Sequence, residues 1–334
     1  MLRLFDDAAP LAGSTRHALR FGRAEGPALR CACLKKAYIW GAFPFISLHP
    51  GRLLDTALDE SSNYPDTEHR LQHHLAREHV FRPQAVLEDC AFLANNWCHT
   101  FFHWMTECLP RVAYFEQAGF RGAYLVRAAA PFMQDSLAML GVSADRIVAY
   151  TPDCIVKNLY VAEKFTFADL TEHAPVFFRI REALRAPTAA PGPRRRVYSH
   201  RSGTRRVLNA EAVQALCRQY AFEIVDLAAL PLARQLEITA NTSILAGPHG
   251  AGMVHAWFLP AGATLIEFFS RKYVNYTARP FIKLLRLTYF PLPEYSNQDY
   301  GDPNFFHNFC TADMTVAEDV LAEILRAAVA LEER

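Results

Sequence analysis

Residues 243–252 read Ser-Ile-Leu-Ala-Gly-Pro-His-Gly-Ala-Gly, and the chain continues through Met-Val-His-Ala-Trp-Phe-Leu-Pro to Ala-Thr-Leu-Ile-Glu-Phe-Phe at 263–269. The pattern predicts a buried strand, a glycine-rich turn, a short helix over 251–259 and a second buried strand. Such a turn directs backbone N–H groups and the positive end of a helix dipole at one point, which suits phosphate. We therefore expect a phosphate-bearing ligand at His249, Gly250, Ala251 and Gly252.

The same alternation of strands and helices begins about fifty residues earlier. Strands are predicted over 196–200, 222–226, 243–247 and 264–269, with helices near 210–220, 232–240 and 251–259. Short connections in this order predict a parallel, doubly wound sheet, whose ligands bind beyond the carboxyl ends of the strands. Arg201 and His249 each follow a predicted strand. Both are therefore expected at the ligand-binding edge.

A proline-rich segment, residues 186–193, separates this half from the rest of the chain. Three prolines and a glycine within it forbid regular structure. We predict an α/β domain over 1–188, a second α/β domain over 189–312, and a last segment over 313–334. The first domain shows predicted strands at 123–126, 146–149 and 155–161 and a helix near 132–140. The last segment has the apolar spacing of an amphipathic helix, capped by Asp313 or Thr315, and could pack back on the first domain.

Composition narrows the class of protein. Lys and Arg (35) nearly balance Asp and Glu (34) in 334 residues, so no overall charge attracts nucleic acid. The eight cysteines show no repeated C-x-x-C pattern, which indicates reduced thiols. No export signal and no run of 18 apolar residues is present. We expect a cytoplasmic protein, with action at the inner face of a membrane open if its substrate is anchored there.

Residues 96–111 form the second informative segment. If it is helical, one face carries side chains spaced four apart: His99, His103, Glu107 and Arg111. A carboxylate one turn from an imidazole can orient it as a general base, which makes His103 and Glu107 the catalytic candidates. Two other interpretations remain: a solvated helix face, or a metal site in a hydrolase with His99, His103 and Glu107 as ligands. Pro110 should disturb the helix near Thr106.

Six arginines surround the first strand of the second half. They are Arg194, Arg195, Arg196, Arg201, Arg205 and Arg206. Guanidinium binds phosphate oxygens through two parallel hydrogen bonds and stays charged, so it suits a diphosphate. The first three fit the end of the linker, whereas Arg201 and either Arg205 or Arg206 follow the strand on the ligand side. Glu267, near the end of its own strand, is a candidate for a ribose hydroxyl.

Taken together, these blocks resemble glycosyltransferase family 61. Four elements match in order: His-Trp-x-x-Glu-x-Leu-Pro-Arg at 103–111, Tyr-Ser-x-Arg with a later Arg and Asn-x-Glu at 198–211, Gln235, and Gly-Pro-His-Gly-Ala-Gly at 247–252 with Gly262 and Ile-Glu at 266–267. They span about half of the chain. Residues 1–85 and those beyond 275 add little to the resemblance.

The resemblance implies a GT-B-like fold of two Rossmann-like domains with the active site in the interdomain cleft. It also implies an inverting, metal-independent transfer of a hexosyl or pentosyl group from a nucleotide-sugar, a UDP-sugar first, without a cofactor. The acceptor would be a glycan or lipid-linked glycan in the biosynthesis of a bacterial surface polysaccharide, such as a capsule or lipopolysaccharide. Donor contacts would come from Arg201, Arg205 or Arg206, Asn209, residues 249–252 and Glu267.

The catalytic base would then be Glu107 or His103, with His99 and Arg111 on the acceptor side. The alternatives are the metal-dependent hydrolase and a non-catalytic module that binds nucleotide-sugars or glycans. Oligomeric state cannot be derived from these patterns.

Overall fold

The computed structural model describes residues 14–20, 28–40, 45–49, 52–53, 81–94, 98–127, 130–163, 165, 170–185, 192–274, 276–294 and 311–333. The chain divides into two compact units, Met1–Ile180 and Arg181–Arg334. Each unit has a β-sheet of its own with parallel strands and helices packed on it, so the predicted α/β class is confirmed. The border between the units falls inside helix α5 (Ala174–Arg185).

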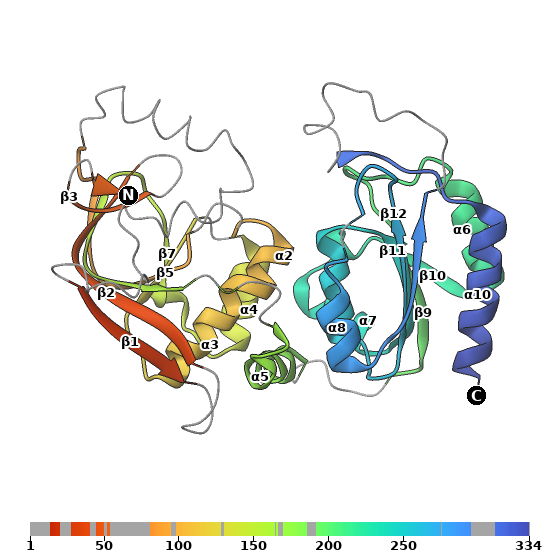
Figure 1. Ribbon diagram of the computed structural model, residues 1–334, viewed down its shortest axis with the longest axis horizontal. Coiled ribbons are helices and arrows are strands. Elements are labelled where there is room, and N and C mark those ends of the chain that lie inside the picture. Colours follow the sequence, from red (N-terminus) through yellow and green to blue (C-terminus); the bar gives the residue numbers. More distant parts are fainter. Residues whose placement is uncertain are drawn as a thin grey trace. The chain divides into compact units, whose positions relative to one another are not determined.

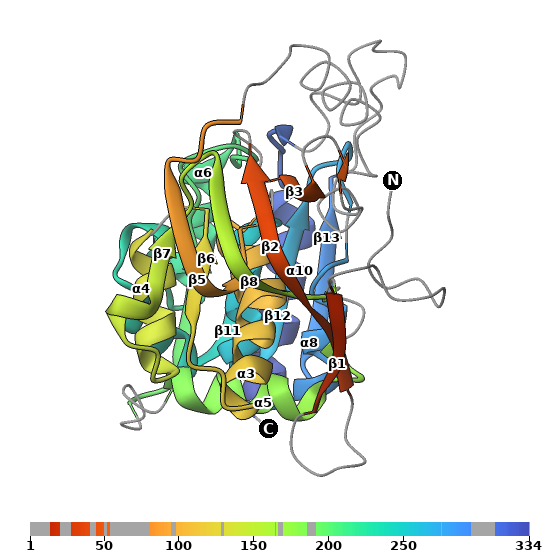
Figure 2. The ribbon, with the colours of Figure 1, turned by 90° about the vertical axis from the view of Figure 1, so that its left-hand side faces the viewer.

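The first unit is built on a mixed sheet (Figure 2). Its strands are β1 (Ser14–Arg20), β2 (Ala28–Trp40), β3 (Phe45–His49), β4 (Arg52–Leu53), β5 (Ala85–Phe92), β6 (Ala123–Val126), β7 (Ile147–Ala149) and β8 (Cys154–Ala162). Across the described part they run in the order β4-β3-β2-β8-β5-β6-β7, with β1 beside β2. The pairs β8–β5, β5–β6 and β6–β7 are parallel, and the pairs of β2 are antiparallel. The three strands predicted for this half are confirmed as β6, β7 and β8.

Helices of the first unit follow β5 and β6. They are α2 (Phe101–His103), the π-helical turn η2 (Trp104–Cys108), α3 (Leu109–Gln117), α4 (Pro131–Met139) and the 3₁₀ turn η3 (Ala144–Arg146). A buried network joins α3 to the sheet, since Glu116 accepts hydrogen bonds from Tyr124 at 2.6 Å and from Arg146 at 2.8 Å. Burial, with the Glu116 contact second, raises the pKa of Tyr124, which therefore stays a hydrogen-bond donor.

The second unit contains a fully parallel sheet in the described residues. Its strands are β9 (Arg195–Ser199), β10 (Phe222–Val225), β11 (Thr242–Pro248), β12 (Thr264–Phe269) and β13 (Thr288–Pro293). Their order, β10-β9-β11-β12-β13, is the doubly wound order 2-1-3-4-5. The direction of winding reverses between β9 and β11, where ligands of such sheets bind. The four predicted strands are confirmed; β13 was not predicted.

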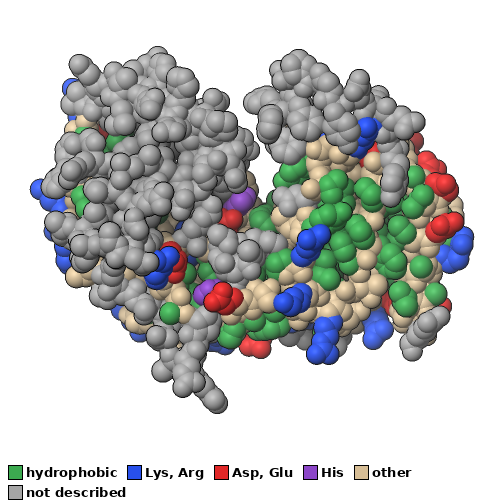
Figure 3. Space-filling view, in the orientation of Figure 1, with side chains coloured by type: hydrophobic (Ala, Val, Ile, Leu, Met, Phe, Trp, Pro, Cys, Tyr) green, Lys and Arg blue, Asp and Glu red, His purple; other side chains and the backbone are tan. Residues whose placement is uncertain are grey.

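Helices cover both faces of this sheet (Figure 1). They are α6 (Ala210–Gln219), the 3₁₀ turn η6 (Leu227–Ala229), α7 (Leu232–Ala240), the 3₁₀ helix η7 (Ala251–Phe258), α8 (Arg279–Leu285) and α10 (Glu318–Glu332). α6 and α10 lie on one face, and α7 and α8 on the other (Figure 1). On the side of the second unit where α8 lies, hydrophobic side chains gather with Lys and Arg between them (Figure 3).

The terminal helix corrects one expectation. α10 contributes Leu321, Leu325 and Ala328 to the core of the second unit, beside Val213 and Cys217 of α6. It starts after Ala317, so neither expected residue caps it. The carboxylate of Asp313 instead bonds Arg206 at 2.8 Å. The apolar stripe was predicted correctly, but its partner follows from long-range packing.

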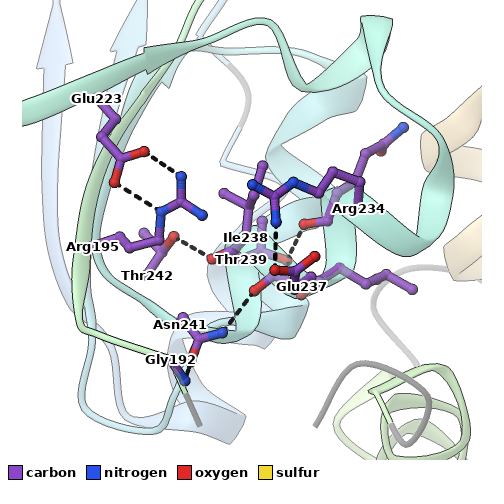
Figure 4. Close-up of polar contacts among 11 residues, drawn as sticks. Gly192, Arg195, Glu223, Arg234, Glu237, Ile238, Thr239, Asn241 and Thr242 are labelled. Atoms are coloured by element: carbon purple, nitrogen blue, oxygen red, sulfur yellow. Dashed lines mark hydrogen bonds and ion pairs between the residues drawn. The ribbon is translucent and has the colours of Figure 1, made fainter. Parts of the chain in front are cut away.

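Structural hydrogen bonds occupy the amino-terminal edge of this sheet (Figure 4). Arg195 pairs with Glu223 of the neighbouring strand. Asn241 accepts a hydrogen bond from the Gly192 N–H at 2.9 Å and donates one to the Glu237 carbonyl at 3.0 Å. These contacts fasten the end of the linker to α7 and β9. Arg195, like Arg196 with its ion pair to Glu332, therefore serves the fold, at the edge opposite to the one expected to bind ligand.

Two general expectations concern the whole chain. Each cysteine within the described ranges is a buried free thiol; Cys310 lies outside them. No helix built from the described residues is both long and apolar enough to cross a bilayer.

Candidate functional site

Two arginines converge on the glycine-rich turn at the carboxyl ends of β9 and β11. A Cβ atom added to Gly250 would lie 2.1 Å from Nη1 of Arg201 and 3.3 Å from Nη2 of Arg205. Arg201 Nε also donates to the Thr204 carbonyl oxygen, which fixes the guanidinium. Only a residue without a side chain lets both cations come this close to the backbone. The turn therefore presents two guanidiniums beside the first turn of η7.

The two cations influence each other. Burial, and secondly the charge of Arg205, lower the pKa of Arg201 to about 10. Arg201 therefore remains charged at neutral pH while part of its hydration is lost. Arg205 has φ of +60°, a backbone conformation that L-residues adopt at a cost. Its guanidinium lies 5.5 Å from the ring centre of Tyr273. An anion bound here would relieve the repulsion between the two guanidiniums.

His249 follows directly in the same turn and is almost fully buried. Nδ1 of its ring lies 2.6 Å from Oε1 of Glu267, and its backbone N–H donates to the Phe268 carbonyl at 2.7 Å. Its ring stacks on Phe269, with centres 5.1 Å apart, and meets Tyr273 at 5.2 Å. The imidazole is thus held on one edge and against two aromatic rings.

Glu267, the candidate for a ribose hydroxyl, has protein partners in the structure. Its carboxylate is completely buried, and both oxygens have protein partners: Nδ1 of His249 and, at 2.8 Å, the hydroxyl of Tyr289. A ribose hydroxyl would have to displace one of them. The geometry therefore gives Glu267 a supporting position behind His249. The sequence missed Tyr289 because β13 lies in a segment where no motif was found.

A second buried histidine, His255, connects the glycine-rich turn to helix α7. His255 of η7 has its Nδ1 2.6 Å from the Gly252 carbonyl and its Nε2 2.8 Å from Oε1 of Gln235 in α7. Gln235 also donates to the Leu230 carbonyl at 2.7 Å. Burial lowers the pKa of His255 to about 4, so the ring is neutral near pH 7. A neutral imidazole has one N–H and donates to only one of these two acceptors.

Two of the expected donor contacts are engaged elsewhere. Arg206 forms an ion pair with Asp313, which leaves Arg205 as the second arginine of the turn. Asn209 accepts a hydrogen bond from the Val316 N–H at 3.0 Å and donates to the Val316 carbonyl at 2.8 Å. Both side chains therefore hold the segment before α10. Their assignment to the donor site stays a prediction.

The catalytic pair expected in the first unit is formed. Nδ1 of His103 lies 2.7 Å from Oε1 of Glu107. Between these residues the helix widens, because the Leu109 N–H bonds the Trp104 carbonyl five residues back. Pro110 lacks the N–H that an α-helix would use to bond the Thr106 carbonyl, so the predicted disturbance near Thr106 is confirmed. Such π-helical turns often occur at functional sites.

The remaining residues of that face behave differently from the expectation. His99 is exposed in a turn, because the helix begins only at Phe101. Arg111 and Glu107 are buried, so the solvated-face interpretation is wrong for both. In the described part of the chain no group of three or more His, Cys, Asp or Glu side chains could hold a metal ion. The hydrolase ligand set of His99, His103 and Glu107 is therefore not assembled.

Comparison with known proteins supports the family resemblance that the motifs indicated. The family model described as Glycosyltransferase 61 matches residues 101–266, about half of the chain. The matched range contains His103, Glu107 and His249 and ends one residue before Glu267. The EGF domain-specific O-linked N-acetylglucosamine transferase of Drosophila melanogaster is 37% identical over 92 residues. That match covers 26% of this chain and 18% of the relative, so the chain matches less than a fifth of that protein's length. On the family match and the order of its motifs, the chain belongs to glycosyltransferase family 61.

Proposed function

We propose that this protein is a glycosyltransferase that takes a sugar from a nucleotide-sugar donor and transfers it to a glycan or glycolipid acceptor. The observation that carries the proposal is the convergence of Arg201 and Arg205 on Gly250. It occurs where the winding of a parallel sheet reverses, the position at which doubly wound sheets bind nucleotides.

A diphosphate is the ligand that fits this end of the sheet. Two guanidiniums offer paired N–H donors to phosphate oxygens, and the first turn of η7 adds backbone N–H groups. Gly247 contributes to the close packing, because a Cβ there would lie 2.8 Å from the Ser199 carbonyl oxygen. In our proposal one ligand, the diphosphate, contacts all the residues of this site: Arg201, Arg205, His249, Gly250, Ala251 and Gly252.

The reaction we propose is a single displacement. The acceptor oxygen bonds to the anomeric carbon while the bond from that carbon to the diphosphate oxygen breaks. The electron pair leaves with the nucleoside diphosphate, whose growing charge the arginines stabilise. A base removes the acceptor proton. One displacement of this kind inverts the anomeric configuration and needs no metal as a reactant.

His103 is the better of the two candidate bases. Its side chain is 33% exposed, whereas that of Glu107 is 8% exposed and bonds Nδ1. We assign proton removal to Nε2 of His103 and the orientation of the ring to Glu107, the division of roles known from other imidazole–carboxylate pairs.

The comparisons support a choice of donor. The name of the fly relative states that it transfers N-acetylglucosamine. We therefore propose a UDP-sugar, with UDP-N-acetylglucosamine as the first donor to test. For the acceptor, what supports a glycan or lipid-linked glycan of surface polysaccharide biosynthesis is the sequence resemblance. Work at the cytoplasmic face of a membrane belongs to the same proposal.

The test is donor turnover by the purified full chain. UDP-, GDP-, CDP- and CMP-sugars are incubated with the protein, with and without EDTA, and released nucleotide is measured by chromatography. We expect one class of donor to be hydrolysed slowly without acceptor, and equally in EDTA. Nucleotide release that EDTA abolishes would support a metal-dependent enzyme instead. Binding without any release, even with acceptor glycans, would support a non-catalytic module.

A further inference from the structure

Three strand ends bring His249, Glu267 and Tyr289 together. In the register of β11 and β12, Gly247 pairs with Glu267, so His249 follows two residues beyond. In the register of β12 and β13, Leu265 pairs with Tyr289. Because side chains alternate along a strand, Leu265, Glu267 and Tyr289 point to the same face of the sheet. The opposite face carries Ile266 and Phe268 in the core with α10.

The hydrogen bonds define which atom carries each proton. Burial, and then the neighbouring Glu267, raise the pKa of Tyr289, so its hydroxyl keeps the proton. Tyr289 therefore donates to Oε2 of Glu267 at 2.8 Å, and an ionised carboxylate accepts only. If the carboxylate is ionised, the hydrogen at Oε1 comes from Nδ1 of His249, 2.6 Å away. The carboxylate thus holds a proton on Nδ1, whether or not Nε2 is also protonated.

The ring cannot turn away from this arrangement. Phe269 stacks on it with an interplanar angle of 23°, and Tyr273 packs at 57°. Within the described residues, Nε2 of His249 has no hydrogen-bond partner, and it is the ring nitrogen directed away from Glu267. It is the atom left to meet a ligand of the turn.

A completely buried carboxylate is a costly way to stabilise a sheet. Replacing a buried ionic pair by apolar residues is often neutral or stabilising, so packing alone does not explain Glu267. Its position behind a histidine of the ligand-binding turn does. The carboxylate also compensates the positive charge that His249 carries whenever Nε2 is protonated.

We propose that Glu267 and Tyr289 are positioning residues that hold His249 with Nε2 directed at the diphosphate of the donor. The inference rests on the proposed function for the identity of the ligand. Tyr289 orients the carboxylate, the carboxylate orients the imidazole, and the ring, when protonated at both nitrogens, donates from Nε2 to a phosphate oxygen. Neither Glu267 nor Tyr289 touches the donor.

The first test needs no nucleotide. Protein labelled with ¹⁵N-histidine is examined by NMR, and the His249 signals are assigned by their loss in His249→Asn. We expect a protonated Nδ1 in the unmodified protein and a shifted Nδ1 signal in Tyr289→Phe, a variant that keeps the shape of the core. Glu267→Ala should move the proton to Nε2. Tyr220→Phe, which removes a hydroxyl bonded to the Ala322 carbonyl, is the matched control and should change nothing. An unprotonated Nδ1 in the unmodified protein, or the same His249 signals in Tyr289→Phe, overturns the proposal.

The second test asks whether Tyr289 acts through His249. UDP, GDP and CDP are titrated by calorimetry, and the tightest is used for a double-mutant cycle. Loss of one hydrogen bond predicts that Tyr289→Phe weakens binding by about 3- to 10-fold. In the His249→Asn background the same change should have less than about a 2-fold effect. Equal effects in both backgrounds would refute positioning through His249. If no nucleotide binds the unmodified protein, the proposed function fails while the NMR result still decides the positioning.

Discussion

Nδ1 of His103 and Oε1 of Glu107 lie 2.7 Å apart across a π-helical turn, with the carboxylate buried and the imidazole partly exposed. A carboxylate in this position orients the ring. The π-helical turn affects the geometry of this pair, because a turn with an additional residue changes the directions in which the two side chains project. The helical segment before Pro110 therefore positions His103 and Glu107 as a pair.

Replacing Glu107 by Gln should slow turnover by about 10²- to 10⁴-fold, because a general base contributes on this scale and the amide no longer enforces its orientation. Affinity for the nucleotide should stay within about 2-fold, since a donor site in the second unit is unchanged. The measurements are kcat for donor turnover from pH 5 to 9 and nucleotide titration. A changed pH profile of kcat distinguishes positioning from a folding defect. Unaltered kcat and pH profile would exclude Glu107 from proton transfer.

Leu325→Ala in α10 should lower the free energy of unfolding by roughly 2–5 kcal/mol, the range for a fully buried leucine. Leu331→Ala is the matched control on the same helix, because Leu331 is 45% exposed, and should cost less than about 1 kcal/mol. Urea unfolding followed by circular dichroism gives both values. Equal losses for the two variants would contradict the packing of α10 in the second core.

His255 should make the protein less stable in mild acid. Its pKa is lowered from 6.5 to about 4 in the folded state, so between these values the unfolded chain binds more protons. Its contribution is complete above pH 6.5 and is lost as pH falls toward 4, by roughly 3 kcal/mol in total. Urea unfolding at pH 7.5 and pH 5 should show a smaller pH effect in His255→Gln than in the unmodified chain. Exposed His99 provides the control substitution, His99→Gln. Parallel pH dependences for all three proteins would be evidence against a neutral buried His255.

Arg205→Gly should separate binding from stability. Glycine adopts φ of +60° freely, so the relief of strain offsets the entropy that glycine adds to the unfolded chain. We expect the free energy of unfolding to change by less than about 1 kcal/mol. Nucleotide affinity should fall about 10-fold or more, because a charged hydrogen-bond donor is lost. Thermal unfolding and calorimetric titration measure the two effects. Unchanged affinity would remove Arg205 from the donor site.

The second unit was largely predictable, for a physical reason. Its strands and helices are short, and glycine, proline or asparagine marks nearly every connection. Once the sheet is parallel, Arg201 and His249 must lie at the same edge, because each follows a strand. The register of that sheet, which sets Gly247 opposite Glu267, is a long-range property. For this reason the contact between Glu267 and His249 could not be predicted from the sequence.

Other features had no local signal. In β2, Cys31–Leu34 are buried in succession, so the alternation that marks a half-exposed strand is absent. Asn209 and Arg206 carry the residue types of a donor site, but their partners lie more than a hundred residues away in the segment before α10. His99 was placed on a helix that starts two residues later. In each case tertiary contacts decided what spacing could not.

The most direct measurement of the central claim is calorimetric titration of UDP, GDP and CDP into the unmodified protein, Arg201→Ala and Arg218→Ala. Arg218→Ala is the control: it removes the same charge from the exposed end of α6, at the opposite edge of the sheet. We predict binding of at least one nucleotide by the unmodified protein, unchanged binding in Arg218→Ala, and a loss of about 10- to 150-fold in Arg201→Ala. Equal affinity of Arg201→Ala and the unmodified protein would contradict a diphosphate site at the ends of β9 and β11.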